Sequence, residues 1–329
     1  MPRTAWLVVG IVVTLAAAVA VWLTSSSPRP SAERLCFVRD DQVHCGGAAL
    51  TFGPRAHFPA GVLGDRLLVV ESAGEGEEHV ERLLLVALDG GVTELHGDAR
   101  RARAPAPGDG DVVMESSRAG FSDLWRLSLD GGAEQLTHDG EAGSFEPQRF
   151  DGGLVYVSSR DGDPELYLWP SGARLTRHPS EDVAPRLSPD GERVVFVSSR
   201  EGSDRLYLLP RGGGEPKPLH AEPLDPGPKG KAHREDVERD AVWTPDGREV
   251  VFAARAGGGH LRLWAADAQT GAVRALTDGQ QDDDQPAVSP DGKWVAFTRG
   301  EPGQLWVVPL GGGAATQVAE RGWLPRWVR

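Results

Sequence analysis

The sequence predicts an all-β protein, a β-propeller of four-stranded blades preceded by one hydrophobic N-terminal helix. Three observations predict this fold. A turn motif of the type Ser-Pro-Asp-Gly recurs along the chain, and an Arg stands six residues before a Leu in five places. Glycine and proline are abundant, at 42 and 25 residues, although 40% of the residues are apolar. Many short strands joined by tight turns account for all three observations.

The N-terminal helix is predicted over residues 4–24, TAWLVVGIVVTLAAAVAVWLT, which carry no charge. A helix of this length spans a bilayer core of roughly 30 Å. The length of the run favours an uncleaved anchor, and a signal peptide cleaved near Ala18-Val19-Ala20 is the alternative. Either one predicts an extracytoplasmic, periplasmic protein, held in the inner membrane or secreted after cleavage. The expected domains are residues 1–33, the segment with its linker, and residues 34–329, the propeller.

The two cysteines, Cys36 and Cys45, lie close together at the start of the expected propeller. In an oxidising compartment, cysteines with this spacing can be joined across a β-hairpin. We therefore predict a disulfide between them, and two unpaired buried thiols are the alternative.

The turn motif stands at 188–191, 244–247 and 289–292, with a weaker copy at 150–153. Proline presets φ in such a turn, and glycine accepts a positive φ. Runs rich in β-branched and aromatic residues follow the turns, as expected of buried strands. Five such runs are Val112–Met114, Leu154–Val157, Val194–Val197, Val250–Ala253 and Val295–Thr298.

An arginine closes each run and is followed six positions later by a leucine, which indicates a hairpin of fixed length. The arginines are Arg118, Arg160, Arg200, Arg255 and Arg299. An aromatic residue follows the leucine in four of the five copies: Trp125, Tyr167, Tyr207 and Trp306. Units close on a Leu-Thr pair at 136–137, 175–176 and 276–277. Each unit thus contains four short strands and recurs about every 40 residues, as propeller blades do.

The number of blades follows from the two ends of the repeat region. Full units begin near Phe58, Pro105, Pro147, Pro185, Ala241 and Pro286. Residues 322–329 resemble another innermost strand, whereas residues 34–52 offer three strands without one. Joining these segments completes a seventh blade and removes exposed sheet edges. The sequence therefore predicts seven blades closed by the terminal strands, with six as the alternative.

These motifs resemble the TolB-type propeller repeat. The pattern is Pro-x-x-Ser-Pro-Asp-Gly, a strand, Ser-x-Arg-x-Gly, a Leu-aromatic pair, a glycine turn and Leu-Thr, and residues 185–207 match it nearly completely. The resemblance covers about residues 55–329. TolB proteins are periplasmic and bind an envelope lipoprotein through the propeller. They also carry a preceding α/β domain, for which residues 30–55 leave no room. The resemblance thus implies a TolB-like propeller that lacks that domain.

The resemblance implies a non-catalytic scaffold that binds a protein or an envelope polymer. A polysaccharide lyase, or another enzyme acting at the central channel, is the alternative. The sequence contains no Gly-x-Ser-x-Gly elbow, phosphate loop or zinc motif. We therefore predict no catalytic residue, cofactor or metal ion. The net charge of −13 disfavours nucleic acid. We expect a monomer, attached to the membrane through residues 4–24 if these are not cleaved.

The predicted partner-binding face carries the five arginines, because the hairpin turns that follow them share one face with the blade-to-blade connections. The same prediction includes Asp182, Asp283 and His233, the last in the long connection at 220–240. In the alternative interpretation, each arginine pairs with an acid of its own hairpin, such as Asp123, Glu165 or Asp204. The acids before the inner strands would then be solvated turn residues, and the long connection would have no role.

Overall fold

The computed structural model describes residues 35–73, 80–96, 103–108, 110–221, 224, 238–255 and 259–328. The hydrophobic helix expected over residues 4–24, the domain boundary at 33–34 and His233 lie outside these residues, so all three stay predictions. No helix in the described part of the chain is long and apolar enough to cross a membrane.

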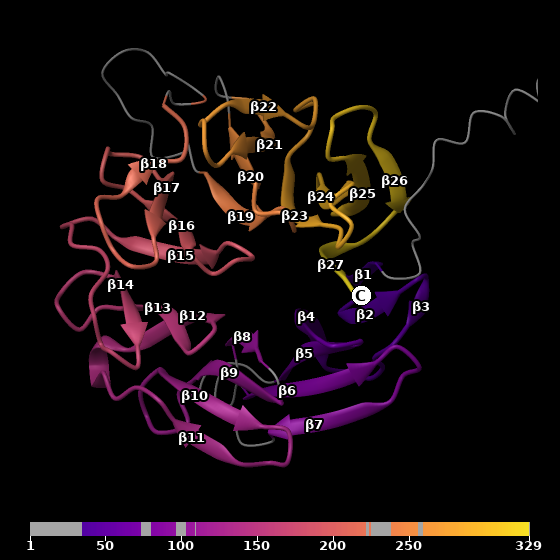
Figure 1. Cartoon of the computed structure of the whole chain (residues 1–329). Coiled ribbons are helices and arrows are strands. Elements are labelled where there is room, and N and C mark those ends of the chain that lie inside the picture. Colours follow the sequence, from indigo (N-terminus) through magenta and orange to yellow (C-terminus); the bar gives the residue numbers. More distant parts are fainter. Residues whose placement is uncertain are drawn as a thin grey trace, which may run out of the picture. The chain divides into compact units, whose positions relative to one another are not determined.

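Seven small antiparallel sheets follow one another in a ring (Figure 1). Blade 1 contains β4 (Ala56–Leu63), β5 (Arg66–Ala73), β6 (Val80–Ala87) and β7 (Val92–His96). Blade 2 contains β8 (Arg103–Pro107), β9 (Asp111–Ser116), β10 (Asp123–Ser128) and β11 (Ala133–Gln135). A short 3₁₀ helix, Gly140–Ala142, leads into blade 3, which contains β12 (Ser144–Phe150), β13 (Gly153–Ser158) and β14 (Glu165–Trp169).

The later blades repeat this order. Blade 4 contains β15 (Asp182–Leu187), β16 (Arg193–Ser198), β17 (Arg205–Pro210) and β18 (Lys217–Pro218). Blade 5 contains β19 (Arg239–Trp243), β20 (Glu249–Arg255), β21 (Leu261–Asp267) and β22 (Val273–Ala275). Blade 6 contains β23 (Asp283–Val288), β24 (Trp294–Arg299), β25 (Gln304–Pro309) and β26 (Thr316–Ala319). Blade 7 is composite and contains β27 (Trp323–Trp327), β1 (Leu35–Arg39), β2 (Gln42–Cys45) and β3 (Ala48–Ala49).

The composite blade confirms the prediction of seven blades and excludes six. Strand β27 pairs antiparallel with β1, so that Leu35 lies opposite Trp327. Each innermost strand contacts the innermost strands of both neighbouring blades, and β27 contacts β4 to complete the circle (Figure 1). Blade 3 departs from the four-stranded expectation, because a single bridge between Tyr167 and Arg174 stands in place of its fourth strand.

The apolar core lies between the blades. Alternate side chains of a strand point to opposite faces of its sheet. A strand whose blade packs against a neighbour on each side is therefore apolar on both of its faces. In β16, Val194 and Phe196 pack against blade 3, whereas Val195 and Val197 pack against blade 5. Similar clusters of buried residues fill the other interfaces between neighbouring blades. This arrangement explains the uninterrupted apolar runs in the sequence.

The Ser-Pro-Asp-Gly turns join the first and second strands of a blade. In the turn of blade 4, Gly191 has a φ of 70°, which favours glycine. The Ser188 hydroxyl donates to the Asp190 carboxylate and accepts the Arg193 backbone N–H at 3.0 Å. The hydrogen bond from Ser188 holds the pKa of Asp190 below its usual value. Each residue type in the motif therefore has a local structural role.

Candidate functional site

A bulge recurs in five of the innermost strands. One residue in each adopts a left-handed backbone, with φ between 50° and 55°: Glu146, Ala184, Asp240, Gln285 and Leu324. The strand register shifts at the same place. Left-handed backbone is unfavourable for residues other than glycine. This conformation recurs at five different residues, which indicates that packing in the closed ring, and not one local sequence, imposes it.

Side chains of the bulge residues link neighbouring blades. The Glu146 carboxylate accepts the Ala184 backbone N–H at 2.7 Å. The Gln285 side-chain oxygen accepts the Leu324 backbone N–H at 2.9 Å. These bonds fix the inner strands relative to one another and so position the side chains that line the channel.

A cavity of about 570 Å³ lies in the channel beside blades 4 to 7. Its lining includes Pro189, Pro245 and Pro290 from the Ser-Pro-Asp-Gly turns. We call this end of the channel the turn rim. Strand β16 begins after one such turn and ends just before Arg200. The turn rim and the face that carries the arginines therefore lie at opposite ends of the blades.

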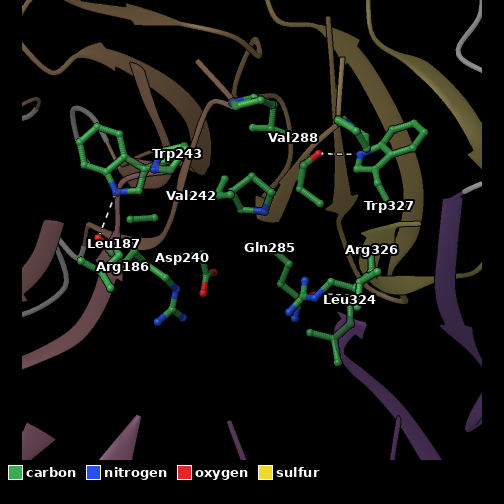
Figure 2. Close-up of a pocket in the computed structure, with 17 residues that line it drawn as sticks. Arg186, Leu187, Asp240, Val242, Trp243, Gln285, Val288, Leu324, Arg326 and Trp327 are labelled. Atoms are coloured by element: carbon green, nitrogen blue, oxygen red, sulfur yellow. Dashed lines mark hydrogen bonds between the residues drawn. The ribbon is translucent and has the colours of Figure 1, made fainter. Parts of the chain in front are cut away.

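Three charged side chains point into this cavity: Arg186, Asp240 and Arg326 (Figure 2). Each arginine donates through Nη1 to the carbonyl of the proline that precedes it, at 2.8 Å for Arg186 and 2.9 Å for Arg326. In blade 3, Gln148 makes the corresponding bond to the Pro147 carbonyl at 3.0 Å. Among the described residues, no carboxylate lies within ion-pair distance of Arg186 or Arg326.

The electrostatic environment of the cavity disfavours further positive charge. Burial lowers the pKa of the Arg326 guanidinium, and the nearby charge of Arg186 lowers it further, against a smaller opposing effect of Asp240. Nearby, burial raises the pKa of Asp284 to about 6, although Arg239 lies 3.0 Å from its carboxylate. The two arginines are therefore cations that the surrounding protein only partly compensates.

Two tryptophans form part of the cavity wall, and their indole N–H groups are already bonded. Trp243 donates to the Arg186 carbonyl at 3.0 Å, and Trp327 donates to the Ala287 carbonyl at 3.0 Å (Figure 2). The Arg193 guanidinium lies over the Trp243 ring, 4.9 Å from its centroid. These side chains therefore shape the wall, and neither indole N–H is available to a ligand.

The arginine face is arranged differently. Four of its five predicted arginines lie over the aromatic ring that follows seven positions later in the sequence. The distances to the ring centroid are 4.7 Å for Arg118, 3.8 Å for Arg160, 4.6 Å for Arg200 and 4.8 Å for Arg299. The recurrent spacing therefore reflects a cation–π contact within each hairpin.

Three of these arginines also pair with an acid that stands at or before an inner strand. Arg160 lies 3.5 Å from Asp139, and Arg200 lies 2.8 Å from Asp182. Arg299 binds Asp283 through two nitrogen atoms, at 2.6 and 2.8 Å. Both Asp182 and Asp283 are buried, so the interpretation of these acids as solvated turn residues is wrong.

For Arg160, Arg200 and Arg299 the alternative pairing with an acid of the same hairpin is also wrong, because each of them pairs with an acid outside its hairpin. Two of the hairpin acids have other partners. Asp123 accepts the Thr137 hydroxyl at 3.1 Å, and Glu165 accepts Arg174 at 2.7 Å. Arg255 differs from the other four arginines, because Arg262 replaces the aromatic residue seven positions later. A partner-binding role for the arginine face stays a prediction.

The predicted pair Cys36 and Cys45 is joined by a disulfide in the structure. The two residues lie opposite each other in β1 and β2, with their Cα atoms 4.1 Å apart. Both pack toward blade 1. The bridge therefore links two strands of the composite blade that closes the ring.

Sequence reasoning missed the channel residues Arg186, Asp240 and Arg326. A signal was present, because Arg186 and Arg326 each follow the proline that marks an inner strand. Within the described residues, no group of three or more His, Cys, Asp or Glu side chains is arranged to hold a metal ion.

Comparison with known proteins places the sequence among propellers. The family model of the TolB beta propeller domain matches residues 153–322, just over half of the chain. An uncharacterized peptidase of Bacillus subtilis is 28% identical over 190 residues, and the match covers 54% of this chain. The matched region is only 25% of that relative, so the chain spans about a quarter of its length.

Solved structures show the same fold. TolB from Acinetobacter baumannii has 20% sequence identity and a TM-score of 0.55, covering 94% of this chain and 70% of that one. An oligogalacturonate lyase in complex with manganese has 17% identity and a TM-score of 0.60, covering 86% of this chain and 83% of that one. At these identities the likeness concerns the fold, and a propeller hosts both binding and catalytic functions.

Proposed function

Because this chain belongs to the TolB β-propeller family, we propose that it is a non-catalytic binding module of the cell envelope, which recognises a protein or an envelope polymer. Its site is the channel mouth at the turn rim. The composition of the cavity carries this proposal. Among the described residues that line it, Asp240 is the one carboxylate, and Ser, Cys, His, Lys and Tyr are absent. Nucleophilic and acid–base catalysis draw mainly on these residue types.

An extracytoplasmic location is part of the proposal. The disulfide between Cys36 and Cys45 supports it, because disulfides persist in oxidising compartments. The uncharged run at residues 4–24 supports export or anchoring. We expect protein purified from the envelope to resist thiol alkylation unless it is first reduced. Alkylation of both cysteines without reduction would contradict the assigned compartment.

The choice of rim rests on which charged groups have partners. Arg160, Arg200 and Arg299 on the arginine face are already paired within the chain. The channel arginines Arg186 and Arg326 have no such carboxylate within the described structure. A cation without a local counter-charge gains more from an incoming anion than one that must first give up its partner.

Site-specific photo-crosslinking of the full chain in cells tests this function. One probe replaces the exposed Asp151 in the β12–β13 turn, at the turn rim, and the other replaces the exposed Glu181, just before β15 on the arginine face. We expect a discrete adduct from the probe at 151 and none from the probe at 181. An adduct from 181 alone would move the site to the arginine face. No adduct from either position, with no partner captured from solubilised envelopes, would contradict a binding function.

A further inference from the structure

Two guanidinium groups share one cavity although they come from distant parts of the chain. Arg186 belongs to β15 of blade 4, and Arg326 belongs to β27 of the composite blade (Figure 2). Each is fastened by one bond from Nη1 to the carbonyl of its neighbouring proline. A guanidinium has five N–H donors in a fixed plane. Each group therefore keeps further donors after this bond is made.

The cavity holds more positive than negative charge. Asp240 is the single acid in its described lining, and its carboxylate also lies 3.6 Å from the Arg239 side chain. This positive site lies in a chain whose net charge is −13. A concave site with low-dielectric walls concentrates the field of such charges. The site should therefore attract an anion that is small enough to enter the channel.

We propose that Arg186 and Arg326 together bind a carboxylate group of a peptide ligand inserted at the turn rim. The inference rests on the proposed binding function and specifies the chemistry of the ligand. Carboxylates accept paired N–H bonds from a guanidinium in a geometry that an ammonium group cannot supply. The cavity of about 570 Å³ lies within the size range of small-ligand sites.

The remaining walls favour a peptide over an acidic sugar. Leu187, Val242 and Leu324 present apolar surface beside the arginines, which suits apolar side chains next to the carboxylate (Figure 2). A sugar ring is held mainly by many polar partners. Both tryptophans of the wall have their indole N–H groups already bonded, and the buried Trp243 ring is also covered by Arg193.

Calorimetric titration of the purified chain with defined peptides tests this site. The probe is acetyl-Ala-Val-Leu with a free carboxylate, and its control is the same peptide with a C-terminal amide. The variants are Arg186→Gln and Arg326→Gln, because Gln148 shows that glutamine makes the same bond to the preceding proline carbonyl. The matched control is Arg248→Gln, an exposed arginine in a turn of the same rim.

We expect the acid to bind and the amide to bind at least about tenfold more weakly, since hydrogen bonds to charged groups are the stronger ones. Each channel variant should lose a similar factor, and Arg248→Gln should bind like the unmodified chain. Asp240→Asn should tighten binding severalfold, because it removes the opposing charge. Equal binding of acid and amide, unchanged affinity in both channel variants, or weaker binding by Asp240→Asn would each overturn the proposal.

Two further outcomes separate this inference from the function on which it rests. Binding of digalacturonate in place of the peptide would assign the site to an acidic sugar and reject a peptide ligand. If the Arg186→Gln and Arg326→Gln variants still give the crosslinked adduct at position 151 in cells, the binding function stands and the carboxylate site is rejected. If no adduct forms in cells but the peptide titration succeeds, the envelope function fails and the site stands.

Discussion

Arg299 illustrates why an arginine recurs at the end of the second strand of a blade. Its guanidinium lies 4.8 Å from the centroid of the Trp306 ring and binds both carboxylate oxygens of Asp283. Asp283 is fully buried. A buried carboxylate is costly unless a cation and hydrogen bonds compensate it. One side chain thus covers an aromatic ring and neutralises a buried charge.

Replacing Arg299 with alanine should therefore destabilise the propeller strongly. The substitution leaves Asp283 buried without its counter-charge, and we expect the free energy of unfolding to fall by about 3–5 kcal/mol. Urea unfolding at neutral pH measures the change. The matched control is Arg255→Ala, because Arg255 makes no ring contact or ion pair with the described residues, and its cost should stay within about 0.5 kcal/mol. Equal losses in the two variants would show that the recurrent arginine stabilises by chain packing alone.

The recurrence of these arginines could be predicted from the sequence, but their partners could not. For Arg200, the neighbouring Asp204 is four positions away, whereas the true partner Asp182 is 18 positions away. Pairing of β15 with β16 places Asp182 opposite Ser198 and so brings it beside Arg200. Distance along the sequence therefore selects the wrong acid for Arg200, because the register of the paired strands decides which acid lies near the guanidinium.

At the scale of elements, a recurrent hydrogen bond to a threonine side chain, which we call the threonine clasp, explains the Leu-Thr pair that closes a unit. In blades 2, 3 and 5, a threonine hydroxyl accepts the backbone N–H of a leucine near the start of the third strand. The bonds join Thr137 to Leu124, Thr176 to Leu166 and Thr277 to Leu263, at 2.9 to 3.0 Å. Blade 4 has His220 in place of threonine, and the Glu238 carboxylate accepts the Leu206 N–H at 2.8 Å instead. The clasp holds the outer edge of a blade where few ladder bonds exist.

Breaking one clasp should cost a measurable part of the stability. Thr277→Val preserves the side-chain shape but leaves the buried Leu263 N–H without its acceptor, so we expect a loss of about 1–3 kcal/mol. Thr316→Val is the control, because the Thr316 side chain in β26 makes no hydrogen bond with the part of the chain that the structure describes. Thermal and urea unfolding compare the two variants. A loss for Thr316→Val as large as that for Thr277→Val would assign the effect to β-propensity or packing.

For the whole ring, the blade count could be predicted because the two ends of the repeat complement each other. Residues 34–52 lack an inner strand, and residues 322–329 supply one. The channel site could not be predicted in the same way. Arg186, Asp240 and Arg326 stand in three inner strands of different blades, and the left-handed bulges that orient such residues leave no sequence mark as clear as a turn motif. Convergence of these side chains is a property of the closed ring.

Closure by β27 should therefore govern the stability of the whole ring. Removing residues 322–329 deletes the inner strand of the composite blade, exposes the edge of β1 and uncovers the buried Leu35. The loss should approach the total stability of a domain, about 5 kcal/mol or more. We expect the truncated chain to melt far below the full chain, and a synthetic peptide of residues 322–329 to restore the melting temperature where a scrambled peptide does not. A truncated chain that melts with the full chain would mean that the ring does not depend on its closing strand.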